Sequence, residues 1–296
     1  MKRFFAFGCS YTFYSWPTWA DFLGLSAEEY ENWAIPGLGN QAIFERVVEA
    51  NTRKKFSKDD VIIIQWSSHL RYDWFNRHSL KDRTSNWRTN GSIFSIQNKE
   101  ILDPHWFYHF FDEFGFLYHT LNFISAAQSL LDAIGCQYYM TGMGDIRNLG
   151  HDLIDDTDFK ENLSEIDKSW HKYPDLLFYE KTIWRDHEHI WLEPQQSYAQ
   201  KHKEKFFKFA DRKRIVTDLH PSPWHHSQWI KEIVQPRLKV NIKTLEINNI
   251  VNSVEEIYQK YGKEKPRDVF DNLLTVKNEF FIPQGMEWPK IYKGIW

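Results

Sequence analysis

Short runs of apolar and β-branched residues recur along the chain and predict buried strands. Each run is about four to eight residues long and is followed by small or polar residues, which is typical of a strand covered on both faces. The predicted strands are residues 3–7, 61–66, 136–140 and 214–217, with a weaker candidate at 30–35.

Between these runs, apolar residues recur three and four positions apart, which predicts helices. Residues 41–50 and 116–134 have this pattern, and Gly135 closes the second helix. Another helix is predicted to follow Ser222 and Pro223, an N-cap and first-turn pair. Strands that alternate with helices indicate a three-layer α/β fold with a parallel sheet. Its working residues collect beyond the carboxyl ends of the strands.

Two long stretches interrupt this alternation. Residues 72–115 are rich in Trp, Phe, His and Arg, and residues 145–212 are polar and aromatic without a clear strand. Both are predicted to be insertions at the functional edge that serve as a substrate lid. We therefore expect one domain over residues 1–238 and a C-terminal extension over residues 239–296, with a helical pattern around 254–261.

Charge and hydropathy exclude several classes of protein. The 296 residues include 37 Lys and Arg against 40 Asp and Glu, so no overall cationic field attracts a polyanion. No stretch reaches the roughly 18 to 20 apolar residues of a membrane helix, and the apolar run Phe4–Phe7 is too short for a secretion signal. We expect no nucleic-acid partner, no membrane segment, and a cytoplasmic or virion-associated protein.

Aromatic residues make up 17% of the chain, and cysteines are few. Tyr and Trp suit cores, interfaces and sugar-like ligands alike, because each is apolar with one polar group. Only Cys9 and Cys136 occur, without metal-ligand spacing, so neither a disulfide framework nor a cysteine metal site is expected.

The residues that follow the predicted strands suggest hydrolytic chemistry. Ser10 follows the first strand, and Asp218 and His220 follow the last. A serine hydroxyl becomes a nucleophile when a histidine takes its proton, and a third group fixes the tautomer of that histidine. Taken singly, Ser10 could cap the next helix and the Asp-His pair could form a structural turn. Their placement at one sheet edge favours a catalytic triad.

Four short blocks of this sequence resemble those of the SGNH (GDSL-like) hydrolase superfamily, and of its divergent phage-type members in particular. The blocks are residues 7–12, 32–40, 63–68 and 217–221. The resemblance implies a flavodoxin-like fold and a serine hydrolase that needs no metal or organic cofactor. It also implies Ser10 as nucleophile, Asp218 and His220 as acid and base, and the backbone N–H groups of Ser10 and Gly37 as oxyanion donors.

Two blocks depart from the superfamily pattern. The third block usually supplies an Asn to the oxyanion hole, and here Ser68 or, from the second block, Asn40 is expected to replace it. The last block usually reads Asp-x-x-His, whereas here it reads Asp-x-His, a spacing that occurs in phage-type members. These members also share the Trp-Ser-Ser-x-x-Arg stretch, in which we predict that Trp66 and Arg71 contact substrate. Arg71 would hold an anionic group, or would instead form a surface ion pair.

Two nucleotide-type alternatives fit parts of the chain. Gly37-x-Gly39-x-x-Ala42 matches a dinucleotide fingerprint, but the acids at 59–60 precede their strand instead of ending it. The Ser/Thr-rich loop after the first strand could bind a phosphate. That interpretation gives Asp218 and His220 no role.

Two further alternatives concern other side chains. Cys9 could be the nucleophile, although a buried turn residue is the simpler interpretation. His225 and His226 could suggest a metal, but no carboxylate lies at a ligand spacing from them.

The sequence thus predicts a serine esterase that removes a short, acetyl-type acyl group. A carbohydrate ester is the favoured substrate, because Trp and Tyr are frequent in the insertions and long apolar runs are few. The alternatives are acyl transfer to a glycan hydroxyl and a non-catalytic glycan-binding or structural module, which the missing third-block Asn would favour.

Overall fold

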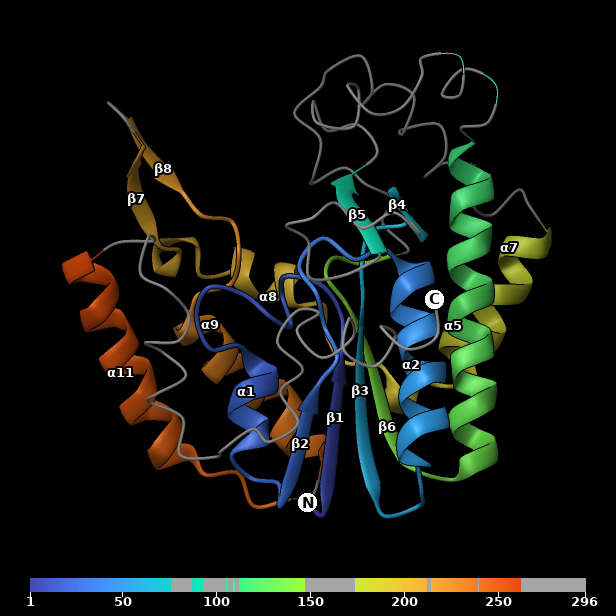
Figure 1. The fold of residues 1–296 in the computed structure, drawn as a ribbon, viewed down its shortest axis with the longest axis horizontal. Helices are drawn as coiled ribbons and strands as arrows, with labels where there is room; N and C mark the ends of the chain where they lie inside the picture. Colours follow the sequence, from blue (N-terminus) through green and yellow to red (C-terminus); the bar gives the residue numbers. More distant parts are fainter. Residues whose placement is uncertain are drawn as a thin grey trace, which may run out of the picture.

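The structure is a computed structural model that describes residues 1–75, 87–92, 105, 109, 112–146, 174–211, 214–238 and 240–261. Within these residues, parallel strands pair in the order β2-β1-β3-β6. Their bounds are β1 (Arg3–Phe7), β2 (Glu29–Asn32), β3 (Asp60–Trp66) and β6 (Gln137–Gly142). The prediction of a parallel α/β sheet is confirmed, and the arrangement is compatible with a flavodoxin-like fold (Figure 1).

Successive side chains of the central strands enter two different cores. Phe5 and Phe7 of β1 pack in the core cluster that includes buried residues of two helices, α2 (Asn40–Lys54) and α5 (Glu113–Ile134). Phe4 and Ala6 pack in a second cluster, which includes residues of α1 (Trp19–Gly24), α9 (Pro223–Trp229) and α11 (Thr244–Tyr261). Helices therefore cover both faces of the sheet and give three layers, which explains why the central strands β1 and β3 are apolar over most of their length (Figure 1).

The predicted strand at 214–217 exists, but it lies outside the parallel sheet. β8 (Arg214–Thr217) pairs antiparallel with β7 (Lys208–Asp211). This hairpin projects from the body on the carboxyl-end side of the sheet, and Ile215 is 79% exposed (Figure 1). Beside β6, Trp191 instead forms an isolated parallel bridge with Met140. Placing residues 214–217 in the sheet was wrong, because an apolar run does not specify which strand it pairs with.

The segments beyond the minimal fold are described in part. β4 (Arg71–Phe75) pairs with β5 (Trp87–Ser92). The other helical segments are α7 (Pro174–Tyr179), η2 (Glu180–Arg185), η3 (Glu188–Ile190), α8 (Gln195–Gln200), η4 (Lys203–Lys205), η5 (Ile230–Val234) and α10 (Gln235–Leu238). Residues 76–86, 93–104, 106–108, 110–111, 147–173 and 212 of the two predicted insertions lie outside the described residues, and so the lid prediction stays untested.

The predicted C-terminal extension begins with a helix that packs on the core. Val251, Val254 and Tyr258 of α11 are buried in the second cluster, together with side chains of β1 and α9. Residues 262–296 lie outside the described part of the chain.

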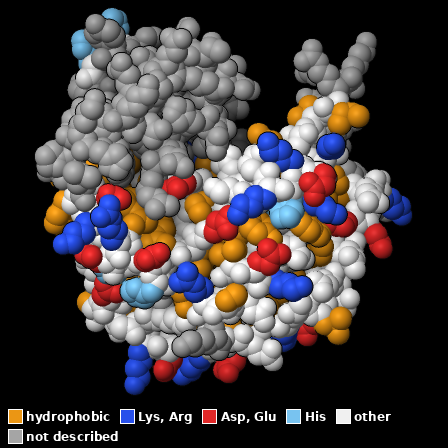
Figure 2. Space-filling view, turned by 180° about the vertical axis from the view of Figure 1, so that it is seen from behind, with side chains coloured by type: hydrophobic (Ala, Val, Ile, Leu, Met, Phe, Trp, Pro, Cys, Tyr) orange, Lys and Arg blue, Asp and Glu red, His pale blue; other side chains and the backbone are white. Residues whose placement is uncertain are grey.

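Charged groups of both signs share the surface. On the face opposite to that of Figure 1, basic and acidic side chains are interspersed, with apolar side chains between them (Figure 2). None of the described helices combines the length and the apolarity that crossing a bilayer requires.

Candidate active site

Ser10 lies in a tight turn directly after β1. The Cys9 carbonyl accepts hydrogen bonds from the N–H groups of Thr12 and Phe13, both at 3.0 Å. A Cβ atom at Gly8 would lie 2.1 Å from Thr12 Oγ1, so this closure requires a glycine. The turn places the buried Ser10 at the carboxyl end of a central strand.

The next helix does not use Ser10 as its cap. α1 begins at Trp19, and Thr18 is its N-cap within a capping box. The structural alternative for Ser10, a helix cap, is therefore excluded.

His220 lies between Ser10 and Asp218 at hydrogen-bond distance from both. Its Nε2 is 3.0 Å from Ser10 Oγ, and its Nδ1 is 2.6 Å from Asp218 Oδ1. Because a carboxylate accepts at Nδ1, we assign the ring proton to Nδ1, which leaves the Nε2 lone pair facing the serine hydroxyl. The structure thus brings together the three residues predicted as a triad, from positions as far as 210 residues apart.

Two tyrosines that closely follow Ser10, Tyr11 and Tyr14, contact His220, and neither was predicted as a site residue. The Tyr14 ring stacks on the imidazole with centroids 3.8 Å apart and an interplanar angle of 18°, and its hydroxyl donates to Asp218 Oδ2 at 2.9 Å. Tyr11 meets the imidazole edge-on at 5.4 Å and donates to the Leu219 carbonyl at 3.2 Å. Burial raises the pKa of both phenols, so they remain donors. The only sequence signal was their proximity to Ser10.

The second block supplies a candidate oxyanion donor at Gly37. Its φ of 86° lies in the left-handed region that favours glycine. Within the described residues, the backbone N–H groups of Gly37 and Ser10 have no hydrogen-bond partner. The Ile35 N–H donates to the Gly8 carbonyl at 3.3 Å, which ties this block to the turn that carries Ser10. Both N–H groups therefore remain available to a ligand.

Asn40 uses its side-chain amide to join α2 to the end of β3. Its Nδ2 donates to the Ser67 carbonyl at 3.0 Å and to Thr120 Oγ1 at 3.1 Å, and its Oδ1 accepts from the Ser67 N–H at 2.7 Å. Both amide hydrogens are engaged, so the geometry does not support Asn40 as an oxyanion donor. It positions Ser67 instead.

The two serines of the third block differ in their contacts. Ser67 Oγ is buried and has no hydrogen-bond partner among the described residues. Ser68 Oγ accepts from the Leu70 N–H at 3.2 Å. In the register Phe7↔Ile64, Ser67 lies three residues after Ile64, as Ser10 lies three residues after Phe7. Ser67 is therefore a further donor candidate, which the prediction of Ser68 left out.

Arg71 and Trp66, both predicted to contact substrate, differ in their surroundings. Arg71 donates to the Leu38 carbonyl at 3.2 Å and contacts Met143 Sδ at 3.5 Å. It forms no ion pair within the described part of the chain, and it links the second block to the end of β6. Trp66 is fully buried in the first core cluster, so its side chain packs in the core and does not face a ligand.

Asp73 caps α2 from the neighbouring β4. Its carboxylate accepts from the Gly39 N–H at 2.8 Å and from the Ala42 N–H at 3.2 Å. Burial raises the pKa of Asp73 to about 6, against the lowering effect of these hydrogen bonds. This contact holds the second block at the start of α2.

His225 and His226 are buried in α9. His225 Nδ1 accepts from the Ser222 N–H, so its Nε2 donates to the His202 carbonyl, each at 3.0 Å. Burial lowers the pKa of His225 to about 4 and that of His226 well below its ordinary value. Both are therefore neutral side chains of the folded core at pH 7.

We expect the domain to lose stability as the pH falls below 6.5. The unfolded chain protonates His225 and His226 near pH 6.5, whereas the folded chain does not, so proton uptake favours unfolding. Lowering the pKa of His225 from 6.5 to about 4 corresponds to about 3 kcal/mol at pH 4. Asp73 has the opposite effect on stability between pH 3.8 and about 6, because its pKa is higher in the folded chain and proton uptake there favours folding. The two histidines destabilise the acid form by more than this one carboxyl stabilises it.

Urea unfolding at pH 7.5 and pH 5.0 measures this loss. His225→Gln keeps a donor toward the His202 carbonyl but does not titrate, so the difference in unfolding free energy between the two pH values should shrink. The exposed His189, changed to Gln, is the control and should leave that difference unchanged. An equal pH dependence in wild type and His225→Gln would contradict the assignment.

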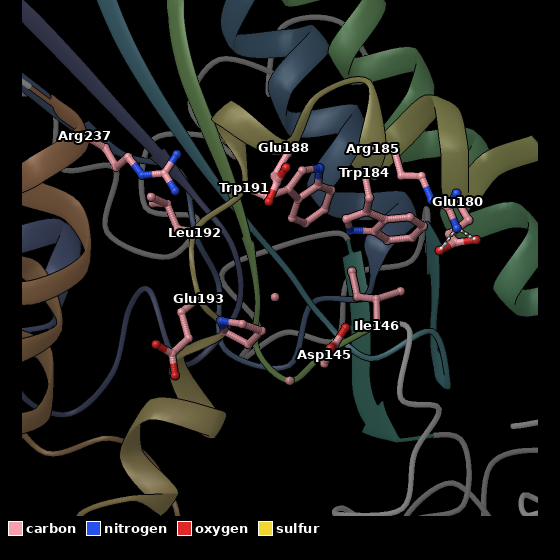
Figure 3. Close-up of a pocket in the computed structure, with 13 residues that line it drawn as sticks. Asp145, Ile146, Glu180, Trp184, Arg185, Glu188, Trp191, Leu192, Glu193 and Arg237 are labelled. Carbon is pink, nitrogen blue, oxygen red and sulfur yellow. Dashed lines mark hydrogen bonds and ion pairs between the residues drawn. The ribbon is translucent and has the colours of Figure 1, made fainter.

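Two pockets lie near the carboxyl edge of the sheet, and no triad residue lines either of them. One, of about 370 Å³, borders Asn40 and Arg71 between α2 and α5. The other, of about 550 Å³, starts at the loop after β6 and is lined by Trp184 and Trp191 together with carboxylates and guanidinium groups (Figure 3). Aromatic rings beside charged groups of both signs suit a polar, ring-shaped ligand better than a long acyl chain.

Comparison with known proteins does not assign the chain to a family. No family model matches it, and no curated protein matches it in sequence.

Proposed function

We propose that this chain is a serine esterase of the SGNH type, which hydrolyses a short-chain ester through an acyl-enzyme. The observation that carries the proposal is the chain of contacts Ser10 Oγ to His220 Nε2 at 3.0 Å and His220 Nδ1 to Asp218 Oδ1 at 2.6 Å. A structural turn does not require a serine hydroxyl to face a histidine whose other nitrogen is held by a buried carboxylate.

The proposed reaction proceeds in two halves. His220 takes the Ser10 proton while Oγ attacks the ester carbonyl, and Asp218 stabilises the resulting imidazolium. The tetrahedral intermediate collapses to an acyl-enzyme, and His220 returns the proton to the leaving alcohol. A water molecule, deprotonated by His220, then attacks the acyl group, and release of the acid restores Ser10.

The oxyanion is proposed to bind at the N–H groups of Ser10 and Gly37. Both groups lack partners within the described residues, and the left-handed backbone at Gly37 holds its N–H in a fixed direction. A hydroxyl of Ser67 or Ser68 serves as the third donor in place of the usual Asn. One such donor is worth roughly 10²- to 10³-fold in rate.

The proposed substrate is an acetyl-type ester of a carbohydrate. The pocket that contains Trp184 and Trp191 supports a sugar over a lipid, because its wall combines aromatic rings with Asp145, Glu188 and Arg237 (Figure 3). Hydrolysis of p-nitrophenyl acetate is expected to exceed that of p-nitrophenyl palmitate at equal concentration. Faster cleavage of the palmitate would contradict the short-chain assignment.

Covalent labelling tests the mechanism without knowledge of the substrate. The wild-type chain is incubated with a fluorophosphonate probe, weighed intact, and mapped by peptide mass. We expect one probe per chain, on the peptide that contains Ser10. Cys9→Ala is the matched control and should label equally, because Cys9 is a buried turn residue. A folded wild type that takes up no probe would overturn the esterase proposal and favour a non-catalytic module.

A further inference from the structure

The segment that carries the nucleophile also holds the loop that carries the base. Four consecutive residues of that loop each contact residues 10–16 by a hydrogen bond. The four contacts are Tyr14 Oη to Asp218 Oδ2 at 2.9 Å, Tyr11 Oη to the Leu219 carbonyl at 3.2 Å, His220 Nε2 to Ser10 Oγ at 3.0 Å, and Trp16 Nε1 to the Pro221 carbonyl at 3.0 Å. Ser10 and His220 are thereby set against each other by one short segment.

We propose that Tyr14 is a positioning residue of the triad, with its hydroxyl orienting Asp218 and its ring supporting His220. The inference rests on the proposed esterase function and adds to it a fourth residue that acts through the acid and the base. Tyr14 is suited to this role because it alone, among the contacts given above, meets both Asp218 and His220.

The hydroxyl of Tyr14 has a specific task because of the short Asp-x-His spacing. Asp218 Oδ1 accepts from both the His220 backbone N–H at 3.0 Å and its Nδ1 at 2.6 Å. Both hydrogen bonds from His220 therefore end on the same carboxylate oxygen. They leave the rotation of the carboxylate plane to be set by the partner of Oδ2. The Tyr14 hydroxyl fixes Oδ2 and so keeps Oδ1 aimed at Nδ1.

The ring of Tyr14 has a second, separable task. It lies nearly parallel to the imidazole, with centroids 3.8 Å apart, so it prevents the base from swinging away on that side. Once His220 has taken the Ser10 proton, the imidazolium faces the negative surface of the ring, which attracts a cation. Trp16 holds the ring from its edge, with centroids 4.6 Å apart and an interplanar angle of 78°.

The phenols and the buried histidine near Tyr14 and His220 are uncharged around neutral pH, and the guanidinium of Arg71 acts on Tyr11. Asp218, Tyr11 and Tyr258 act electrostatically on Tyr14, and His220 acts on the buried His226. Burial raises the pKa of Tyr11, Tyr14 and Tyr258, and lowers that of His226. Around neutral pH, the charged groups are therefore the Asp218 carboxylate beside the base and, on the far side of Tyr11, the Arg71 guanidinium.

Two substitutions separate the hydroxyl from the ring. Tyr14→Phe removes the donor and keeps the ring, whereas Tyr14→Leu removes both. The measurement is the second-order rate constant of fluorophosphonate labelling between pH 5 and pH 9, with circular dichroism to verify folding. We expect Tyr14→Phe to label roughly 10-fold more slowly and Tyr14→Leu roughly 100-fold more slowly than wild type.

The pH dependence of the labelling rate distinguishes a positioning role from a merely structural one, because loss of a structural contact alone would not shift it. In Tyr14→Phe the Asp218 carboxylate no longer shares its charge with a phenol, so it holds the imidazolium more strongly and the acid limb moves to higher pH. In Tyr14→Leu the support of the ring is also lost, so the acid limb lies at lower pH than in Tyr14→Phe. Tyr118→Phe, an exposed position on α5, is the control and should match wild type.

The outcomes separate this inference from the function on which it rests. A wild type that does not label overturns the esterase proposal itself. A wild type that labels, with a folded Tyr14→Phe that has the same rate and the same profile, overturns the positioning role alone. Because Phe matches Tyr in shape, the test stands even if Tyr14→Leu fails to fold.

Discussion

Replacing Ser10 with alanine is expected to lower the turnover of p-nitrophenyl acetate by about 10⁶-fold and to abolish fluorophosphonate labelling. The substitution removes the oxygen that lies 3.0 Å from His220 Nε2 and leaves the base without a proton to take. Any residual reaction would come from the oxyanion donors and binding alone. The measurement is initial-rate hydrolysis followed at the absorbance of nitrophenolate, in parallel with intact mass.

Ser15→Ala is the matched control for this experiment. It lies in the loop before α1, is partly exposed, and belongs to none of the contacts that hold the triad. It should retain both labelling and turnover. If Ser10→Ala folds and keeps wild-type turnover, Ser10 is not the nucleophile, and Cys9 or a reaction without a covalent intermediate would have to be considered.

Replacing Asp218 with alanine is expected to lower turnover by roughly 10⁴-fold. The carboxylate accepts from the backbone N–H and from Nδ1 of His220, and it is the buried charge next to the imidazolium. Alanine removes both the orientation and the charge, so the ring loses its tautomer as well as its counter-ion.

Asp218→Asn distinguishes these two contributions. The His220 backbone N–H favours the amide oxygen at the Oδ1 position, so that oxygen still accepts from Nδ1 and the amide nitrogen faces Tyr14. We therefore expect a smaller loss than for alanine, at roughly 10²-fold, which represents mainly the missing charge. Equal losses for Asn and Ala would mean that charge dominates, and wild-type rates for both would exclude Asp218 from the mechanism.

The sequence was sufficient to find the three residues that meet at the candidate site, although part of the reasoning was wrong. Ser10 follows a strand of the parallel sheet, as expected. Asp218 and His220 follow a strand of a separate hairpin. The loop of residues 218–221, here called the base loop, reaches Ser10 through its contacts with residues 11–16. A local hydrophobic pattern predicts that a strand exists, whereas its partner depends on contacts between segments distant in sequence.

Side-chain roles were less predictable than positions. Asn40 and Trp66 both lie in blocks that the resemblance singles out, yet one bonds to Ser67 and Thr120 and the other is buried in the core. Tyr14 was overlooked because its two partners lie more than 200 positions away in the chain. The direction in which a polar group donates is decided by tertiary packing, which spacing along a sequence does not encode.

In the proposed mechanism, the separation of Ser10 from His220 in the chain also sets the point of protein synthesis at which activity can arise. Their contact joins positions 210 residues apart, which takes about 10 to 40 s of translation at roughly 5–20 residues per second. Tyr258 of α11 stacks on Phe207 at 3.8 Å and meets Trp16 edge-on, so the base loop is fully supported later still. A nascent chain would therefore carry an unactivated serine until nearly all of the described residues have left the ribosome, and esterase activity would report completed folding.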